Sequence, residues 1–506
     1  MKSVNLEKER IQGGYILSSL EKHFLNGDAY VRLSEVYDIC KKSFQYVSFD
    51  QFQEDFKYLL QKGALWYESG RVYQEQTHRY EESAAASLSA ILKNNTMPCP
   101  PLPATIKAKD GASLCKEQRD AVQMALSHRL SVILGGAGTG KSTLIQTITQ
   151  YVPQEGEQVL CAPTGKAARN LSERTGKEVR TIHSALGVLP DEDFLDPVCW
   201  DNVGLVVADE ASMMTLGMLA GILKKVRWNC RVVLLGDSNQ LLSVGSGNVL
   251  PDLTRLGIPC FRLKENHRQD LGAKELLTNV TGFSGIHSEA DLVYGESFQL
   301  VCMSEQCARE ALIDEATLRY LAGERVQVLS PYNSATDLSV AKLNHAIRDR
   351  VNPKTEDMKT FGDRFRDGDR VIITRNDRER NCSNGDVGFL HIIDDSKVKP
   401  LFQVVLPDGR CPTWGNLDGL EQIALAYALT VHKSQGSEYD IILMPITESF
   451  SNMMYRNLIY TAISRARQRV ILYGSRNALS SAIQRPAKAR KSQLIQKSLG
   501  ISDQCA

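Results

Sequence analysis

The sequence has 506 residues, of which 42% are hydrophobic and 24% charged, and its net charge is +1. This composition is typical of a globular protein with about three or four domains, and the near-zero charge neither supports nor excludes a polyanionic partner. No apolar run approaches the roughly 20 residues that span a membrane, and the polar first residues lack the apolar core of a signal peptide, so we expect a cytoplasmic protein without membrane contact. The 12 cysteines form no C-x-x-C pair, which favours reduced thiols over a zinc site or a disulfide framework.

Residues 1–93 form the first block, in which apolar residues recur every three or four positions, as in helices that bury one face. The segment 64–73 has Ser69-Gly70 between apolar residues and predicts a β-hairpin. Helices followed by a hairpin indicate a helical, winged-helix-like N-terminal domain, which could contact nucleic acid or serve packing and partner docking. Residues 94–112 contain four prolines and predict a linker.

From residue 113 onward, short aliphatic and β-branched runs alternate with helical patterns. Continuous apolar strands between amphipathic helices predict an α/β fold with parallel sheets covered on both faces. Between 362 and 425, turn signals recur about every ten residues and predict a small antiparallel β-barrel inserted into the second sheet domain. The expected parallel strands are 132–134, 159–162, 205–208, 232–235, 326–329, 441–444 and 470–473.

The run Gly-Gly-Ala-Gly-Thr-Gly-Lys-Ser-Thr at 135–143 lies between an expected strand and a helical pattern. The G-x-x-x-x-G-K-[ST] spacing lets backbone N–H groups and a helix N-terminus point at the phosphates of a nucleotide. Lys141 is expected to reach the β and γ phosphates, and the Ser142 hydroxyl to hold Mg²⁺. The loop residues expected to bind the triphosphate are Gly136, Ala137, Gly138, Thr139, Gly140, Lys141, Ser142 and Thr143.

Two carboxylates, Asp209 and Glu210, follow the expected strand 205–208. Ligands bind at the carboxyl ends of strands in open parallel sheets, so we expect this pair to lie near the phosphate loop. Asp209 would complete the magnesium shell through water, and Glu210 would orient and deprotonate the attacking water. Gln240 follows another expected strand, and its amide could sense the γ phosphate.

Three more side chains are candidates for the same site. Gln118 could present a donor and an acceptor to the adenine edge. Arg268 and Arg465 lie outside the first sheet domain, and an arginine at the transferred phosphoryl group contributes on the order of 10³ to 10⁵ in rate. Supplying it from a second domain would make hydrolysis depend on closure of the cleft between the domains. Considered alone, either arginine could instead form an ordinary ion pair at the protein surface.

These segments occur in a fixed order along the chain. They are Gln118, the loop 135–143, APTGKAA (162–168), TIHSAL (181–186), DEAS (209–212), GDSNQL (236–241), HRQ (267–269), ALTVHKSQGSE (428–438) and YTAISRAR (460–467). In this order they resemble the RecD-like helicases of superfamily 1, over about residues 113–475. The N-terminal block resembles the region that precedes the motor in long-form bacterial RecD-type proteins, without their additional N-terminal helix-hairpin-helix modules.

The resemblance implies an α/β protein with two RecA-like P-loop motor domains, ATP in the cleft between them and single-stranded DNA across the top of both sheets. The cofactors would be ATP and Mg²⁺, and the motor would move 5′ to 3′ in DNA repair or recombination in the bacterial cytosol or nucleoid. The expected divisions are a helical N-terminal domain (1–93), a linker (94–112), a first motor domain (113–262), a second motor domain (263–361 and 426–484), an inserted β-barrel (362–425) and a mobile basic tail (485–506).

By motif match, the resemblance implies contacts to the phosphates and sugars of the strand. Gly436 and Glu438 would link these contacts to the nucleotide, and the segment 187–202 would hold the hairpin that splits the duplex, unless it is a plain connecting loop. The expected DNA contacts are Thr164, His183, Thr430, His432, Lys433 and Ser434. A possible arginine guide in the barrel region, unless these side chains are merely solvated, comprises Arg364, Arg366, Arg370, Arg375, Arg378 and Arg380.

The sequence leaves three hypotheses. The first is an autonomous ATP-dependent helicase or translocase that acts on single-stranded DNA and on junctions between single and double strands. The second is a motor subunit that works only with other recombination or nuclease subunits in a larger complex. The third is a noncatalytic DNA-binding clamp, which the joint presence of Lys141, Asp209, Glu210, Arg268 and Arg465 disfavours.

Overall fold

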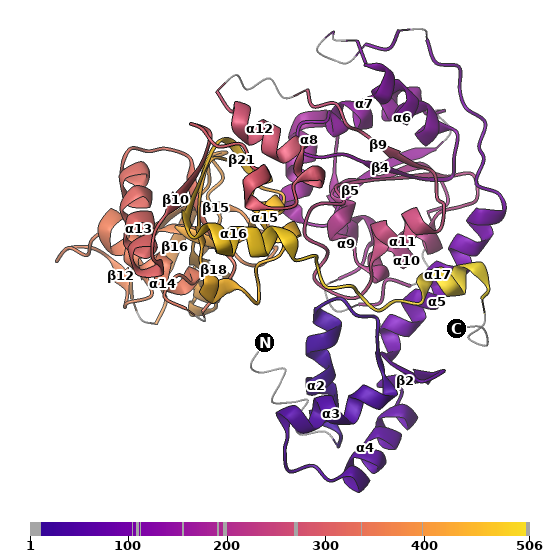
Figure 1. Ribbon diagram of the computed structural model, residues 1–506, viewed down its shortest axis with the longest axis horizontal. Coiled ribbons are helices and arrows are strands. Elements are labelled where there is room, and N and C mark those ends of the chain that lie inside the picture. The colour runs from indigo at the N-terminus through magenta and orange to yellow at the C-terminus, as the bar shows by residue number, and fades with distance from the viewer. Residues whose placement is uncertain are drawn as a thin grey trace.

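The computed structural model describes residues 12–103, 105–107, 111, 113–153, 156–189, 192–195, 200–267, 272–334, 336–396 and 398–501. The N-terminal helices extend away from a first α/β domain, and a second α/β domain lies beside the first (Figure 1). Within these ranges, no helix combines the length and the apolar character that crossing a membrane requires.

The N-terminal domain combines helices with a three-stranded antiparallel sheet, in line with the predicted helices and hairpin. Strands β2 and β3 turn at Ser69 and Gly70, both of which have positive φ. Helix α5 extends beyond this domain, because Ala84, Leu88 and Ile91 are buried in the core of the first α/β domain. The elements are α2 (Gly14–Leu25), β1 (Tyr30–Arg32), α3 (Leu33–Ser43), α4 (Phe49–Gln61), β2 (Leu65–Glu68), β3 (Arg71–Gln74) and α5 (Glu75–Lys93).

The first α/β domain is built on a six-stranded parallel sheet in the order β6-β5-β7-β8-β4-β9. Its interior strands β4 and β8 are buried along their whole length, as their continuous aliphatic runs predict. Because β7, β8 and β4 are neighbours, their carboxyl ends bring Asp209, Asp237 and Gly135 to one edge of the sheet. The elements are α6 (Lys116–Leu126), β4 (Leu130–Leu134), α7 (Lys141–Tyr151), β5 (Glu157–Ala162), α8 (Gly165–Thr175), β6 (Arg180–Thr181), α9 (Ile182–Leu186), β7 (Val203–Ala208), α10 (Leu216–Lys225), β8 (Arg231–Gly236), α11 (Val249–Arg255) and β9 (Cys260–Arg262).

The second α/β domain has a five-stranded parallel sheet in the order β10-β21-β20-β11-β19. Its helices and strands share a large apolar core that includes Phe298, Leu443 and Leu472. The parallel sheets predicted from the sequence are therefore confirmed in both domains. The elements are α12 (Lys274–Thr281), β10 (Phe298–Cys302), α13 (Glu305–Leu321), β11 (Val326–Ser330), α14 (Val340–Val351), β19 (Ala428–Thr430), β20 (Tyr439–Ile446), α15 (Arg456–Ser464), β21 (Ala466–Gly474) and α16 (Arg476–Gln484).

An antiparallel β domain is inserted between α14 and β19, as the turn pattern predicts. Its main sheet has five strands in the order β17-β16-β15-β14-β18, and β12 and β13 form a separate short pair. Phe402 stacks on Trp414 in its core, with ring centroids 5.4 Å apart. The elements are β12 (Thr360–Phe361), β13 (Phe365–Arg366), β14 (Arg370–Ile373), β15 (Val387–Asp394), β16 (Leu401–Val405), β17 (Thr413–Trp414) and β18 (Ile423–Leu425).

The segment expected to hold a duplex-splitting hairpin, 187–202, lies partly outside the described residues. Its described part, 187–189, 192–195 and 200–202, contains no strand. Phe194 instead packs against Tyr80 of α5, with ring centroids 5.8 Å apart, and its N–H donates to the Tyr80 hydroxyl (3.3 Å). The described portion therefore anchors the first α/β domain to helix α5.

The C-terminal segment is docked as far as residue 501, which corrects the expectation of a mobile basic tail. After α16, residues 485–493, which we call the strap, lead to α17 (Leu494–Leu499), and α17 packs on α5 (Figure 1). The Lys491 N–H donates to Asp28 Oδ1 (3.0 Å), and the Lys491 carbonyl accepts from the Ala29 N–H (2.7 Å). The side chains of Lys488 and Lys491 pair with Asp28 and Glu35, acidic partners that are far away in the sequence.

Arg490 is the most extensively bonded residue of the strap. Its guanidinium donates to Ser243 Oγ (3.0 Å) and to the carbonyl oxygens of Gly245 (3.3 Å) and Gly247 (2.6 Å). A Cβ placed at Gly27 would lie 2.1 Å from Arg490 Nε, so glycine there leaves room for the guanidinium. Arg490 therefore joins the strap to the first α/β domain and packs against Gly27 of the N-terminal domain.

Replacing Arg490 with alanine should lower the free energy of unfolding by about 2 to 4 kcal/mol, because buried acceptors of a charged donor lose their partner. The Arg490→Ala variant should also become sensitive to proteases within 485–501. Lys488→Ala is the matched control: this side chain is largely exposed, and its loss should change the free energy by less than about 0.5 kcal/mol. Urea unfolding and limited proteolysis check this; equal behaviour of the two variants would contradict the docking of the strap.

Candidate functional site

The phosphate loop joins β4 to α7 at the carboxyl edge of the first sheet. Gly138 and Gly140 have φ angles of 82° and 81°, which glycine adopts without strain, and α7 begins directly after Gly140. Lys141 Nζ donates to the carbonyl oxygens of Gly135 (2.6 Å) and Gly136 (3.0 Å). The loop therefore combines a helix N-terminus with an ammonium group, an arrangement suited to an anion.

Asp209 and Glu210 follow β7 at the same edge. Asp209 Oδ1 accepts a hydrogen bond from the Glu210 N–H (2.9 Å), and removal from water, together with the Glu210 carboxylate, raises the pKa of Asp209 to about 6. Glu210 has a φ of 51°, a left-handed conformation that costs a non-glycine residue free energy. Glu210 Oε2 is buried and has no hydrogen-bond partner among the described residues. Such an oxygen suits a water or cation ligand.

One narrow pocket is lined by residues of both α/β domains. Its volume is about 40 Å³. Arg465 is buried in its wall, and the Arg465 Nε has no hydrogen-bond partner in the part of the chain that the structure describes. Unpaired guanidinium and carboxylate atoms beside a phosphate loop fit a magnesium-bound triphosphate. The lining residues are Ser142, Ala167, Asn170, Leu171, Arg174, Asp209, Glu210, Gly436, Glu438 and Arg465.

The segment 237–241 is hydrogen-bonded to helix α15 of the second α/β domain. The Tyr460 hydroxyl donates to Asp237 Oδ2 (2.5 Å), and burial raises the pKa of both groups. The Leu241 N–H donates to Thr461 Oγ1 (2.8 Å). Gln240 Oε1 is buried within this segment, with no partner among the described side chains and backbone. Gln240 thus lies where the two domains meet.

Gln118 lies beside the phosphate loop and also takes part in the cap of α6. Its Oε1 accepts from the Cys115 N–H (3.2 Å), and its Nε2 would lie 2.5 Å from a Cβ placed at Gly140. One acceptor position of the amide is therefore used by the helix cap, while the NH₂ group packs against the loop. The sequence pattern alone did not reveal this second role.

Arg268 lies outside the described residues. The residues just before it cross the phosphate loop: the Asn266 side chain donates to the Ala137 carbonyl (3.1 Å), and the His267 N–H donates to the Gly138 carbonyl (2.9 Å). The chain that leads from the first α/β domain toward the second is thus bonded to the loop itself. These contacts were not foreseen from the sequence, because both acceptors are backbone carbonyl groups, which no side-chain pattern reveals.

Gly436 and Glu438 face helix α8 across the cleft. The Gly436 carbonyl accepts from Asn170 Nδ2 (2.5 Å), although the two residues are 266 positions apart. Glu438 pairs with Arg174 (3.2 Å) and Arg467 (2.8 Å). Asn170 and Arg174 are therefore site residues that the sequence reasoning missed, because nothing in a helical pattern identifies a partner so far along the chain.

Two candidate DNA contacts of the first α/β domain lie near helix starts. Thr164 caps α8, since its Oγ1 accepts from the Ala167 N–H (3.2 Å). His183 packs on Phe194 with ring centroids 5.0 Å apart, and removal from water lowers its pKa, which keeps the ring neutral at pH 7. Both side chains therefore have structural partners of their own.

The candidates between Thr430 and Ser434 differ in exposure. Lys433 is exposed, and its N–H donates to Thr430 Oγ1 (3.2 Å). His432 is half-buried, and removal from water together with the Arg490 guanidinium lowers its pKa. Ser434 is fully buried, and its hydroxyl donates to the Val431 carbonyl (2.8 Å). In this conformation, Ser434 stabilises the turn and does not reach the surface, contrary to the expectation of a DNA contact.

Four arginines of the expected barrel guide form contacts within the second α/β domain and its insert. Arg378 instead donates to Ser184 Oγ (2.9 Å) of the first domain and so bridges the two. The expected guide is therefore largely a set of structural contacts. The four pairs are Arg364 with Glu421 (2.6 Å), Arg366 with Asp349 (2.7 Å), Arg370 with Gln327 (3.1 Å) and Arg380 with Asp377 (2.5 Å).

Three protein families match successive parts of the chain. An AAA domain matches residues 113–282, a UvrD-like helicase C-terminal domain matches 425–473, and the SH3 domain of ATP-dependent RecD-like DNA helicases matches 343–402. Among solved structures, Bacteroides Pif1 bound to ssDNA is similar, with a TM-score of 0.44 and 18% identity over 72% of this chain and 94% of that chain.

Two curated relatives cover most of the chain. The ATP-dependent RecD2 DNA helicase of Deinococcus radiodurans is 31% identical over 466 residues, which are 89% of this chain and 62% of the relative. This chain therefore spans less than two thirds of that protein. The RecBCD enzyme subunit RecD of Mycolicibacterium smegmatis is 30% identical over 415 residues, which are 74% of this chain and 73% of the relative. The chain belongs to the RecD-like family of superfamily 1 DNA helicases.

Proposed function

We propose that this chain is an ATP-dependent motor that moves along single-stranded DNA and unwinds the duplex ahead of it. The observation that carries the proposal is the shared pocket, in which Ser142, Asp209 and Glu210 of the first α/β domain meet Arg465 of the second. A site assembled from two domains is complete only when the cleft between these domains closes. Hydrolysis can therefore be coupled to relative movement of the domains.

The residues of the candidate site have different proposed roles in ATP hydrolysis. Lys141 would leave the loop carbonyls to bind the phosphates, and Ser142 and Asp209 would hold Mg²⁺. When bound, Mg²⁺ neutralises phosphate charge. The Glu210 carboxylate would position the attacking water and accept its proton. Arg465 would stabilise the charge on the transferred phosphoryl group, and Arg268 has the same proposed role by its place in the family pattern.

Movement of the domains would pass through the contacts at the cleft. Gln240 would bind the γ phosphate, and the loss of that phosphate would alter the segment 237–241 and its hydrogen bonds to α15. Glu438, paired with α8, lies a few residues beyond the exposed Lys433, so a change at the cleft can reach the DNA-binding turn. Alternating grip by the two domains would then produce a step along the strand.

The isolated chain should hydrolyse ATP strongly only with single-stranded DNA. In Lys141→Ala, this turnover should fall by at least about 10²-fold, because a cation is removed from the phosphates. Lys62→Ala, an exposed change in the N-terminal domain, is the control and should behave as the unchanged protein. Steady-state ATPase assays with and without the strand measure this. Equal turnover without DNA would contradict the motor, and an inactive chain would favour a subunit of a larger helicase–nuclease complex.

We propose 5′-to-3′ movement from the family pattern. A fork with only a 5′ single-stranded tail should be unwound, and the matched fork with only a 3′ tail should remain intact. A strand-displacement assay with ATP and Mg²⁺ compares the two forks under the same salt. Unwinding of the 3′-tailed fork alone would reverse the proposed polarity while leaving the ATP site as proposed.

Lys433 and Ser434 form a matched pair for testing the DNA-binding turn. Lys433→Ala should weaken binding of single-stranded DNA and reduce the salt dependence, log Kd against log salt, by about 0.7, the slope of one lost phosphate contact. Ser434→Ala should leave that slope unchanged, since the hydroxyl is buried. Fluorescence anisotropy over a salt series measures both, and equal slopes for Lys433→Ala and the unchanged chain would exclude a phosphate contact by Lys433.

A further inference from the structure

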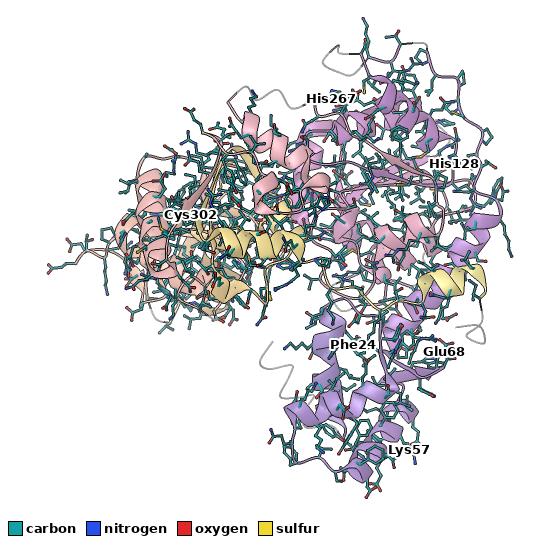
Figure 2. All side chains as sticks on the ribbon, viewed as in Figure 1. Phe24, Lys57, Glu68, His128, His267 and Cys302 are labelled. Carbon is teal, nitrogen blue, oxygen red and sulfur yellow. The ribbon has the colours of Figure 1, made fainter. Side chains whose placement is uncertain are left out.

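Three metal-ligating side chains meet beside the phosphate loop. Cys115 Sγ lies 3.8 Å from His267 Nε2, and the ligand atoms of Cys115, Glu265 and His267 all lie within 4.8 Å of one another. His267 lies near α6 and α7 at the rim of the first α/β domain (Figure 2). The nucleotide chemistry proposed above gives none of these three side chains a role.

The backbone on both sides of the cluster is held in place. Cys115 is the N-cap of α6, in a capping box with Gln118. The Glu117 carboxylate accepts from the N–H groups of Lys264 (2.9 Å) and Glu265 (3.2 Å). Together with the bond from the His267 N–H to the phosphate loop, these contacts fix the backbone that carries the ligands before any ion arrives. Ligands held in advance by their own hydrogen bonds bind a metal at low cost in ordering.

The spacing of the ligand atoms matches a tetrahedral transition-metal site. Bond lengths of Zn²⁺ to sulfur and imidazole nitrogen place those two ligands about 3.6 Å apart, close to the observed separation of Cys115 and His267. Thiolate, imidazole and carboxylate together suit Zn²⁺ and exclude Mg²⁺, which prefers oxygen ligands alone. The absence of a C-x-x-C pair does not oppose such a site, because Cys115 and His267 are 152 positions apart.

We propose that Cys115, Glu265 and His267 form a binding site for Zn²⁺ or a related divalent transition-metal ion, with water in the fourth position. Binding breaks the S–H bond of Cys115, forms a bond from sulfur to the metal, and releases the proton to solvent.

The bound ion would join the start of α6 to the residues that cross the phosphate loop. His267 Cδ2 lies 3.7 Å from the position of a Cβ on Gly140, so the imidazole packs at the first turn of α7. Fixing the imidazole would therefore restrain the mouth of the loop and the chain that leads to the second α/β domain. We therefore expect the bound ion to lower the rate of ATP hydrolysis.

Titration of the metal-free chain with Co²⁺ tests the site directly, because a thiolate bound to Co²⁺ absorbs in the near ultraviolet. We expect one equivalent with this absorption. Cys115→Ser should abolish it and keep α6, since serine is a good N-cap. Cys99→Ser, at an exposed cysteine outside the cluster, should retain it. Affinity should fall by at least about tenfold in His267→Ala and recover in His267→Cys. The same absorption in Cys115→Ser as in the unchanged chain would overturn the proposal.

A second measurement tests whether the bound ion slows ATP hydrolysis, and it rests on the proposed motor function. Zn²⁺ in slight excess over the protein should lower DNA-stimulated ATP turnover of the unchanged chain and of Cys99→Ser, with no effect on Cys115→Ser. Equal inhibition of the unchanged chain, Cys99→Ser and Cys115→Ser would contradict an effect of this site on ATP hydrolysis. Since the Co²⁺ titration involves no ATP, failure of the metal site and failure of the proposed motor are distinguishable.

Discussion

The hydrogen bond between Asp237 and Tyr460 links the nucleotide-binding edge of the first α/β domain to helix α15 of the second. A buried carboxylate is costly unless it is hydrogen-bonded, so the second domain supplies part of the stability of the first domain's site. The Tyr460 hydroxyl also lies 3.0 Å from the position of a Cβ on Gly136, so it packs close to the phosphate loop. Any movement that separates the domains must break the hydrogen bond between Asp237 and Tyr460. Such a movement would also change the surroundings of the phosphate loop.

The strap connects the same two domains by a second route. It begins after α16 in the second α/β domain, and Arg490 binds the loop at Ser243 and Gly247, shortly after the segment that contains Asp237. Removal from water lowers the pKa of His432 in the candidate DNA-binding turn, and the charge of the Arg490 guanidinium in the strap lowers it further. The strap therefore bonds both to the N-terminal domain and to the loop that follows the segment 237–241 of the candidate site.

Much of the architecture could be predicted because its causes are local. Glycines at 138 and 140, followed by Lys141, determine a turn into a helix, and continuous aliphatic runs determine buried parallel strands. The turn at Ser69-Gly70 and the inserted antiparallel domain followed from turn chemistry in the same way. The exposure of single residues did not follow: Lys433 and Ser434 are adjacent, yet one is exposed and the other fully buried, because packing around the turn decides it.

The sequence by itself determined the chemical groups of the candidate site, their order and the strand ends that carry them, since backbone preference and apolar periodicity act over a few residues. Only the tertiary structure decided which groups meet. Gly436 bonds to Asn170 over 266 positions, the basic tail finds acidic partners at the N-terminal domain, and Cys115 meets His267 across 152 positions. Hydrogen bonds and ion pairs depend on distances of a few ångströms, which no local pattern encodes and which only the packed domains establish.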